Sequence, residues 1–167
     1  MIEYPVLLVF PAAMAFAGAM DLLTMTIPNR ISIILVAGFA IAAAIMGIGW
    51  WALASHLGAG LLMLAIGIAM FSLGWLGGGD AKLLAAAALW VGLDHLLPYV
   101  LLIGIAGGGL SIAILTYRRM PMPLWLARQD WAINLHRAKS GIPYGIAIAA
   151  AGLHVFPSTS WFALPGI

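Results

Sequence analysis

The sequence predicts an all-α protein that crosses a membrane about six times, with its N-terminus and C-terminus both outside. Its 167 residues are 65% hydrophobic and 7% charged, whereas soluble domains average roughly 25% charged residues. No Lys, Arg, Asp or Glu occurs between Arg30 and Asp80 or after Lys139, and a bilayer span needs about 20 apolar residues. Composition and charge-free length together indicate a polytopic membrane protein.

The first two expected spans cover residues 5–26 and 31–48. Between them lies Pro28, and proline disfavours helical geometry in the residue before it. No basic residue precedes the first apolar stretch, and the stretch is long enough to span, so we expect a membrane helix and not a secretory signal. Trp50 and Trp51 follow the second span and suit the aromatic belt of a membrane interface.

The remaining expected spans cover residues 53–76, 81–93, 96–117 and 142–156. The glycines at 77–79 separate the third span from the fourth. The fourth is short for a bilayer, so we expect it to be tilted or to thin the bilayer locally. All six belong to a single domain, residues 1–167.

The basic residues all fall on one side of this layout. They are Arg30, Lys82, Arg118, Arg119, Arg128, Arg137 and Lys139. The opposite side receives Glu3, His56, Asp94 and His95. Because cytoplasmic loops carry an excess of Lys and Arg, the first side is predicted to be cytoplasmic.

One cytoplasmic segment, residues 118–140, is not a span. It contains Pro121 and Pro123, and its Trp125, Trp131 and Leu135 stand among basic residues. An amphipathic helix on the interface would place the apolar side chains in lipid and the charges in water. An ordinary basic loop fits the same composition, and the sequence leaves both interpretations open.

Several kinds of site are disfavoured by composition. The chain has no cysteine, which excludes disulfides, thiol nucleophiles and multi-cysteine zinc sites. The net charge of +2 reflects membrane topology and does not indicate nucleic-acid binding. The four histidines are scattered without ligand spacing, so we expect no metal and no cofactor; they are His56, His95, His136 and His154.

Asp21 and Asp80 are the candidate catalytic residues. A carboxylate inside a membrane is costly, roughly 2.5–3.5 kcal/mol at the centre and less near the boundary, and is a functional candidate by default. Two intervening spans return the chain to the same boundary, so the two aspartates can be neighbours. Two adjacent carboxyl groups tend to share one proton. The ionised one can then activate water while the protonated one polarises a carbonyl.

Each aspartate also has a simpler interpretation. Asp80 follows glycines and precedes an apolar run, as a helix N-cap does. Asp21 could pair with a polar neighbour such as Thr24 or line an ion pathway. A small transporter or proton-relay subunit is therefore an alternative, although transporters usually place such groups near mid-membrane. The flexible glycines at 77–79 allow close backbone approach and favour catalysis.

The local sequences resemble the active-site motifs of type IV prepilin leader peptidases. Residues 21–29 (DLLTMTIPN) and 77–83 (GGGDAKL) are similar to the two aspartate motifs, and the second contains the GxGD element shared with presenilins and preflagellin peptidases. Residues 140–145 (SGIPYG), at the start of the last span, complete the resemblance. It implies an intramembrane aspartic peptidase of the bacterial inner membrane, with Asp21 and Asp80 catalytic near the cytoplasmic face.

The resemblance also implies partners. The substrate would be a pilin precursor with a short basic leader and an apolar helix, within membrane lipid, and components of a pilus assembly machinery are further partners that it allows. Larger members carry a cysteine zinc cluster and methylate the new N-terminus. This chain has neither cysteine nor insertion after its first span, so it resembles the compact enzymes of tight-adherence (Flp-type) pili, and the resemblance does not extend to N-methyltransferase activity. A preflagellin-type or other GxGD protease is the enzymatic alternative.

Other residues are expected to shape the site or the helices. The site-shaping group comprises Gly77, Gly78, Gly79, Lys82, Pro28 and Asn29. Lys82 could instead snorkel as a membrane anchor, and Pro28 and Asn29 could simply end the first helix. Gly104 and Gly108 have GxxxG spacing and predict helix packing.

Overall fold

The computed structural model describes residues 3–123, 126–137 and 141–162, and all regular structure within these ranges is helical. The helices are α1 (Glu3–Leu7), α2 (Val9–Thr24), α3 (Asn29–Met46), α4 (Trp50–Ser72), α5 (Gly78–Val91), α6 (Leu96–Arg119), α7 (Asp130–His136) and α8 (Tyr144–Val155). Short 3-10 turns occur at Leu93–His95, Leu126–Arg128, Phe156–Ser158 and Ser160–Phe162. The expectation of an all-α protein is confirmed.

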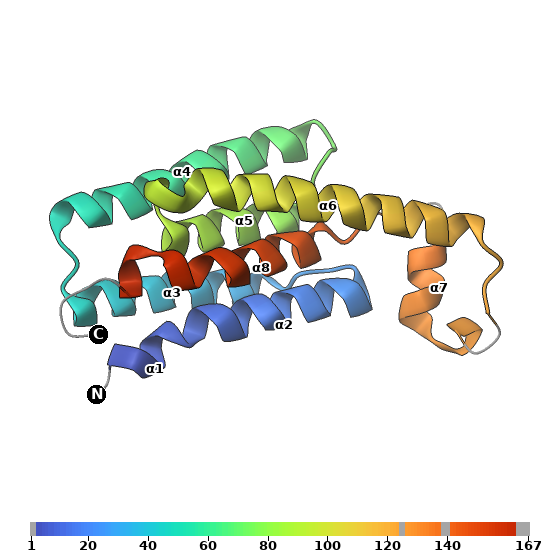
Figure 1. Cartoon of the computed structure of the whole chain (residues 1–167), viewed down its shortest axis with the longest axis horizontal. Coiled ribbons are helices and arrows are strands. Elements are labelled where there is room, and N and C mark those ends of the chain that lie inside the picture. Colours follow the sequence, from blue (N-terminus) through green and yellow to red (C-terminus); the bar gives the residue numbers. More distant parts are fainter. Residues whose placement is uncertain (1–2, 124–125, 138–140, 163–167) are drawn as a thin grey trace.

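The helices run alternately up and down one long axis (Figure 1). The chain enters at the end where α1 lies and passes along the bundle through α2, α3, α4, α5, α6 and α8 in turn. Helix α8 finishes at the end where α1 begins, while α7 lies at the opposite end (Figure 1). We call this opposite end the α7 end. The alternation matches the order of crossings expected from the sequence.

Within the described residues, four helical stretches are long and apolar enough to cross a membrane. They are Pro5–Thr24, Asn29–Met46, Trp50–Ser72 and Leu93–Arg119. Large apolar side chains cover the outside of the bundle, with Trp50 and Trp51 exposed by 74% and 85%, as befits a surface that faces lipid. The chain is therefore a membrane protein.

Helices α5 and α8 have only 14 and 12 residues, fewer than the roughly 20 that a span needs. They lie inside the bundle, and most of their side chains are buried. Small residues allow neighbouring helices to approach them closely: a Cβ on Gly67 of α4 would lie 3.1 Å from Ala81 Cβ, and one on Gly18 of α2 would lie 3.1 Å from Ala149 Cβ. Six full spans and the orientation of the termini remain predictions.

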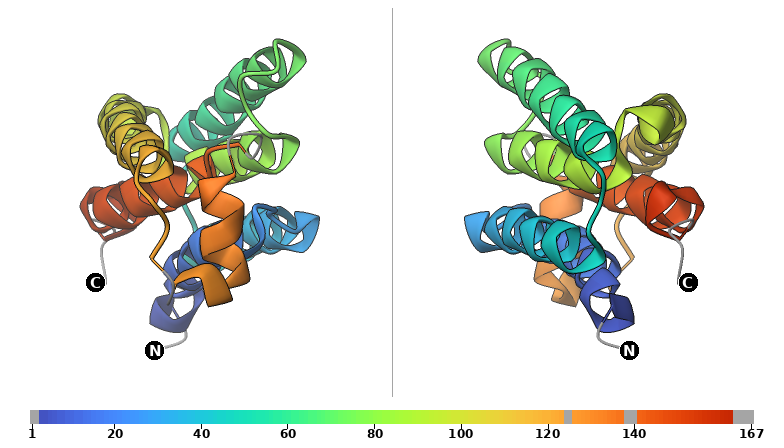
Figure 2. Two further views of the ribbon diagram at one scale, coloured as in Figure 1. Left: turned by 90° about the vertical axis from the view of Figure 1, so that its right-hand side faces the viewer. Right: turned by 90° about the vertical axis from the view of Figure 1, so that its left-hand side faces the viewer.

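Helices α4 and α6 diverge above α5 and α8 (Figure 2). Helix α4 packs mainly on α5, and α6 packs mainly on α8. The two outer helices are thus supported mainly by different inner helices.

In the segment 118–140, the described residues 118–123 and 126–137 lie at the α7 end of the bundle. Arg118 Nε donates a 2.7 Å hydrogen bond to Leu135 O, and its Nη2 donates one of 2.9 Å to Gly141 O. Ala132 and Leu135 of α7 are buried within the protein. Of the residues expected to face lipid, Trp131 is half-buried and Trp125 lies outside the described residues. The choice between loop and interfacial helix stays a prediction.

An aromatic cluster fills the core near the other end. Trp90 Nε1 donates a 2.9 Å hydrogen bond to Leu35 O, and Trp161 Nε1 donates one of 2.7 Å to Trp90 O. His56 packs between Phe39 and Trp161, with its Nδ1 2.6 Å from Leu89 O. These contacts give His56 a structural environment at a distance from both aspartates along the bundle.

Candidate active site

Asp21 lies in the last turn of α2, and the chain turns sharply after it. Helix α2 ends at Thr24, earlier than the proline at 28 requires, because Met25 adopts a left-handed conformation (φ 55°). The Met25 N–H donates a 2.9 Å hydrogen bond to Asp21 O. A non-glycine residue in this conformation is uncommon and is often found at functional sites. Ile27, two residues after Met25, lies against Gly79 and Gly145.

Asp80 lies in the first turn of α5, but it is not the N-cap. Gly77 occupies the N-cap position, and Asp80 is the third residue of the helix. From this position an acidic side chain can reach back toward the N-cap N–H, and the Gly77 N–H does lie near the Asp80 carboxylate. The N-cap interpretation of Asp80 is therefore only partly right. Its side chain can help to start α5, although Gly77 occupies the N-cap position.

Asp21 and Asp80 line one cavity of about 330 Å³. Its wall is completed by Met25, by residues 74–77 before α5 and by residues 141–144 at the start of α8. The structure therefore brings together three segments that are distant in sequence, all at the α7 end of the bundle. The predicted proximity of the two aspartates is present in the structure.

Backbone N–H groups lie near both carboxylates, but one oxygen of each carboxylate has no hydrogen-bond partner among the described residues. The N–H groups of Gly145 and Ile146 lie near Asp21, and that of Gly145 also lies near Asp80. Asp21 is 4% exposed, and Oδ2 of Asp21 and Oδ1 of Asp80 are buried with no hydrogen-bond partner in the described part of the chain. Buried polar atoms are nearly always satisfied, and exceptions indicate catalytic or otherwise strained groups. The Thr24 hydroxyl is not the partner of the Asp21 carboxylate, because it donates a 2.7 Å hydrogen bond to Met20 O.

Gly145 is a site residue that the sequence-based site set omits. A Cβ at this position would lie 2.7 Å from Asp21 Oδ2 and 2.6 Å from Ile27 Cδ1. Only glycine lets the start of α8 approach the carboxylate so closely. Its place at the end of the SGIPYG motif was the available signal. Gly141 and Tyr144 of that motif also line the cavity, while Ser140 lies outside the described residues.

The three glycines before Asp80 act by close approach and not through unusual dihedral angles. Gly77 has φ −69°, and a Cβ there would lie 2.8 Å from Asp80 Oδ2. Gly79 faces the turn after Asp21, where a Cβ would lie 3.2 Å from Ile27 Cβ and 3.3 Å from Ile27 O. Gly78 faces only the Phe71 ring at 3.3 Å. Gly77 and Gly79 thus allow Asp80 and the Asp21 turn to meet.

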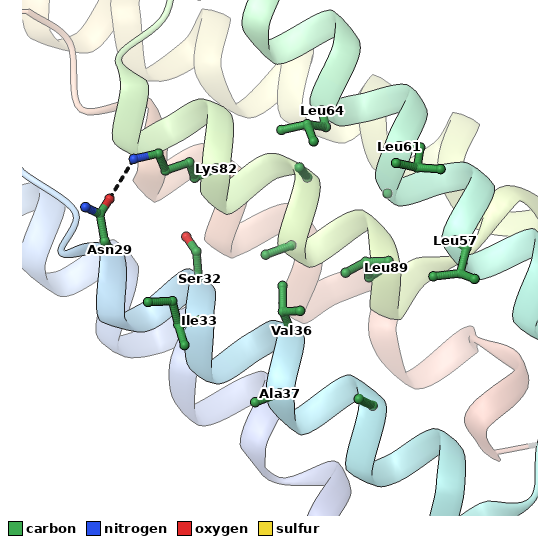
Figure 3. A pocket seen from close by; sticks show the side chains of 14 residues that line it. Asn29, Ser32, Ile33, Val36, Ala37, Leu57, Leu61, Leu64, Lys82 and Leu89 are labelled. Carbon is green, nitrogen blue, oxygen red and sulfur yellow. Dashed lines mark hydrogen bonds between the residues drawn. The ribbon is translucent and has the colours of Figure 1, made fainter.

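Lys82, Asn29 and Pro28 do not line the carboxylate cavity. Lys82 Nζ donates a 2.9 Å hydrogen bond to Asn29 Oδ1, and both line a larger apolar groove between α3 and α4 (Figure 3). Pro28 is the N-cap of α3. These residues therefore connect the two aspartate segments from outside the cavity, which differs from the expected direct role in shaping it.

The arrangement can perform acid–base chemistry without a metal ligand set. Among the described residues, no three His, Asp or Glu side chains gather to hold a metal ion. Two carboxyl groups in one small cavity can share a proton, and a peptide carbonyl between them would meet both an acid and a base. Helix dipoles distinguish the pair, since the start of α5 favours negative charge on Asp80 and the end of α2 disfavours it on Asp21.

One comparison with known proteins identifies a family for this chain. The model of the type IV leader peptidase family matches residues 8–112, which include both aspartate motifs but not the SGIPYG segment. No curated protein and no solved structure matches the chain at a significant level.

Proposed function

Because the chain belongs to the type IV leader peptidase family, it is a leader-peptidase-like protease, and we propose that it is an intramembrane aspartic endopeptidase. The observation that carries the proposal is the single cavity lined by Asp21 and Asp80. Its substrate is the precursor of a type IV, Flp-like pilin, from which it removes the leader at the cytoplasmic face of the membrane.

The proposed mechanism uses the pair as one acid–base unit. Ionised Asp80 accepts a proton from water while protonated Asp21 donates a hydrogen bond to the scissile carbonyl oxygen. The water oxygen bonds to the carbonyl carbon to give a tetrahedral intermediate. The C–N bond then breaks, and the proton held by Asp80 passes to the departing amine. The Gly145 and Ile146 N–H groups, which lie near Asp21, help to hold the site rigid during these transfers.

The cytoplasmic location is supported by charge. Arg30 is the second residue of α3, Lys82 is the fifth residue of α5, and Arg118 and Arg119 end α6; these helix ends lie at the α7 end (Figure 1). Excess Lys and Arg mark the cytoplasmic side of a bacterial inner-membrane protein. A prepilin leader lies on that side with its apolar helix in the membrane, which puts the cleavage point at the depth of the cavity.

The test is reconstitution. The purified full chain in lipid vesicles is mixed with an Flp-type prepilin carrying its leader, and the product is analysed by mass spectrometry. We expect a single cut that releases the leader from the apolar helix. Full-length precursor remaining after prolonged incubation with folded enzyme would contradict the proposal.

A further inference from the structure

An apolar groove of about 490 Å³ runs between α4 and α6. Met63, Ile66 and Met70 of α4 form one wall, and Gly104 and Gly108 of α6 belong to the other. Leu84 of α5 and Ile148 of α8 form the floor. The groove lies between α4 and α6, the two helices that diverge in Figure 2.

The groove is continuous with the carboxylate cavity. Trp75, Leu76 and Tyr144 line both. The groove side is apolar apart from the Tyr144 hydroxyl, whereas the cavity side contains the buried, unpartnered Oδ2 of Asp21. A molecule that fits both must be apolar along most of its length and present a polar, reactive group at one end.

Gly104 and Gly108 in the α6 wall leave room for another helix to enter the groove. A Cβ at Gly104 or Gly108 would meet nothing within 4 Å, so neither glycine packs on another described helix, and the packing predicted from their GxxxG spacing is wrong within this chain. Gly107 packs instead, with a Cβ 3.1 Å from the Tyr144 ring. Small residues four apart let a second helix backbone approach closely.

We propose that the α4–α6 groove receives the apolar helix of the substrate, laterally from the bilayer, and so delivers the peptide bond before that helix to Asp21 and Asp80. The inference rests on the proposed function and names how that substrate is held. A polypeptide with a polar segment joined to an apolar helix matches this surface. Its apolar helix would lie in the apolar groove, and its polar segment would lie in the cavity that contains the carboxylates.

The larger groove, about 880 Å³ between α3 and α4, is the competing location. Neither aspartate lines it, and it shares no lining residue with the cavity. Its polar end is closed by the Lys82–Asn29 hydrogen bond (Figure 3). A helix bound there would present its end to Lys82 and not to the carboxylates.

Disulfide cross-linking distinguishes the two grooves. Because the chain has no native cysteine, any disulfide must form at the introduced cysteine. Single cysteines are introduced by Gly108→Cys in the α4–α6 groove, Val36→Cys in the larger groove and Gly109→Cys as the matched control. Gly109 is exposed on the same helix, has equally open space for a Cβ, and does not line the groove. Each is combined with Asp80→Asn, so that bound prepilin with one cysteine in its apolar helix is not consumed.

We expect a disulfide to the prepilin from Gly108→Cys and none from Gly109→Cys or Val36→Cys. A cross-link from Val36→Cys without one from Gly108→Cys would overturn the proposal, as would equal cross-linking from Gly108→Cys and Gly109→Cys.

Cleavage provides the second readout. Gly108→Leu places a larger side chain in the groove, on a Cβ that meets nothing within 4 Å among the described residues, and should slow prepilin cleavage about tenfold or more. Gly109→Leu should leave the rate within about twofold. Normal cleavage by Gly108→Leu would show that the groove is not the docking site, although the peptidase function would stand. Failure of the unaltered enzyme to cleave would instead remove the proposed function itself.

Discussion

Lys82 Nζ donates a 2.9 Å hydrogen bond to Asn29 Oδ1. The bond joins α5, two residues after Asp80, to the start of α3, which follows the Asp21 turn. The bond lies outside the carboxylate cavity. It can therefore hold the two aspartate segments in register without taking part in the chemistry.

The first prediction concerns this bond. Lys82→Met and Asn29→Ala should each lower the cleavage rate modestly, and the double variant should lose no more than the more damaging single one. Because Lys82 is exposed, the coupling free energy should not exceed about 1 kcal/mol. A double-mutant cycle on cleavage rates measures it, and fully additive losses would show that the two side chains act separately.

The second prediction concerns Gly145. Gly145→Ala places a methyl group 2.7 Å from Asp21 Oδ2, and relieving that overlap must move the carboxylate or the start of α8. Cleavage should fall about tenfold or more. The matched control is Gly141→Ala, in the same cavity wall but with nothing within 4 Å of the added methyl group. Equal rates for the two variants would refute a special role for Gly145.

The third prediction concerns Gly79. Gly79→Val adds a branched side chain against the backbone of Ile27 and should separate the Asp80 segment from the Asp21 turn. Cleavage should be impaired while the protein remains inserted in the membrane. Gly78→Ala serves as the control, since its added methyl group meets only the Phe71 ring, which can shift. Normal processing by Gly79→Val would reduce these glycines to a simple helix break.

The fourth prediction concerns topology. Reporter fusions after Gln129 and at the two chain ends should fall into two classes, with Gln129 cytoplasmic and both ends periplasmic. The reason is the gathering of Lys and Arg at the α7 end. A periplasmic signal from the Gln129 fusion would reverse the layout and place the carboxylate cavity on the outer side.

The long helices could be predicted from sequence because each is a long apolar run with at most two charged residues, which lie near its ends. Their observed ends lie within a few residues of those expected. The end of α2 could not be predicted, because no sequence signal as clear as a proline indicates the left-handed conformation of Met25. Helices α5 and α8 are too short for length to decide whether they span, and their burial depends on neighbours that only the assembled bundle supplies.

The meeting of Asp21 and Asp80 was predictable from counting crossings, since an even number returns the chain to one boundary. Gly145 was not assigned to the site because its role depends on tertiary contact between α8 and Asp21. The spacing of Gly104 and Gly108 suggested packing, yet both face an open groove. Spacing shows which residues share a helix face but not whether a neighbouring helix covers it.

The central claim is that Asp21 and Asp80 are one catalytic pair, and the most direct measurement is prepilin cleavage by Asp21→Asn and Asp80→Asn in vesicles at equal amounts of folded enzyme. Equal amounts matter because Asp80 also lies where it can help to start α5. Each substitution keeps the shape of the side chain but removes its acid–base capacity, so each should slow cleavage at least about a hundredfold. Asp94→Asn, at the other end of the bundle, should cleave normally. A folded Asp80→Asn enzyme that releases the leader at a near-normal rate would contradict the account.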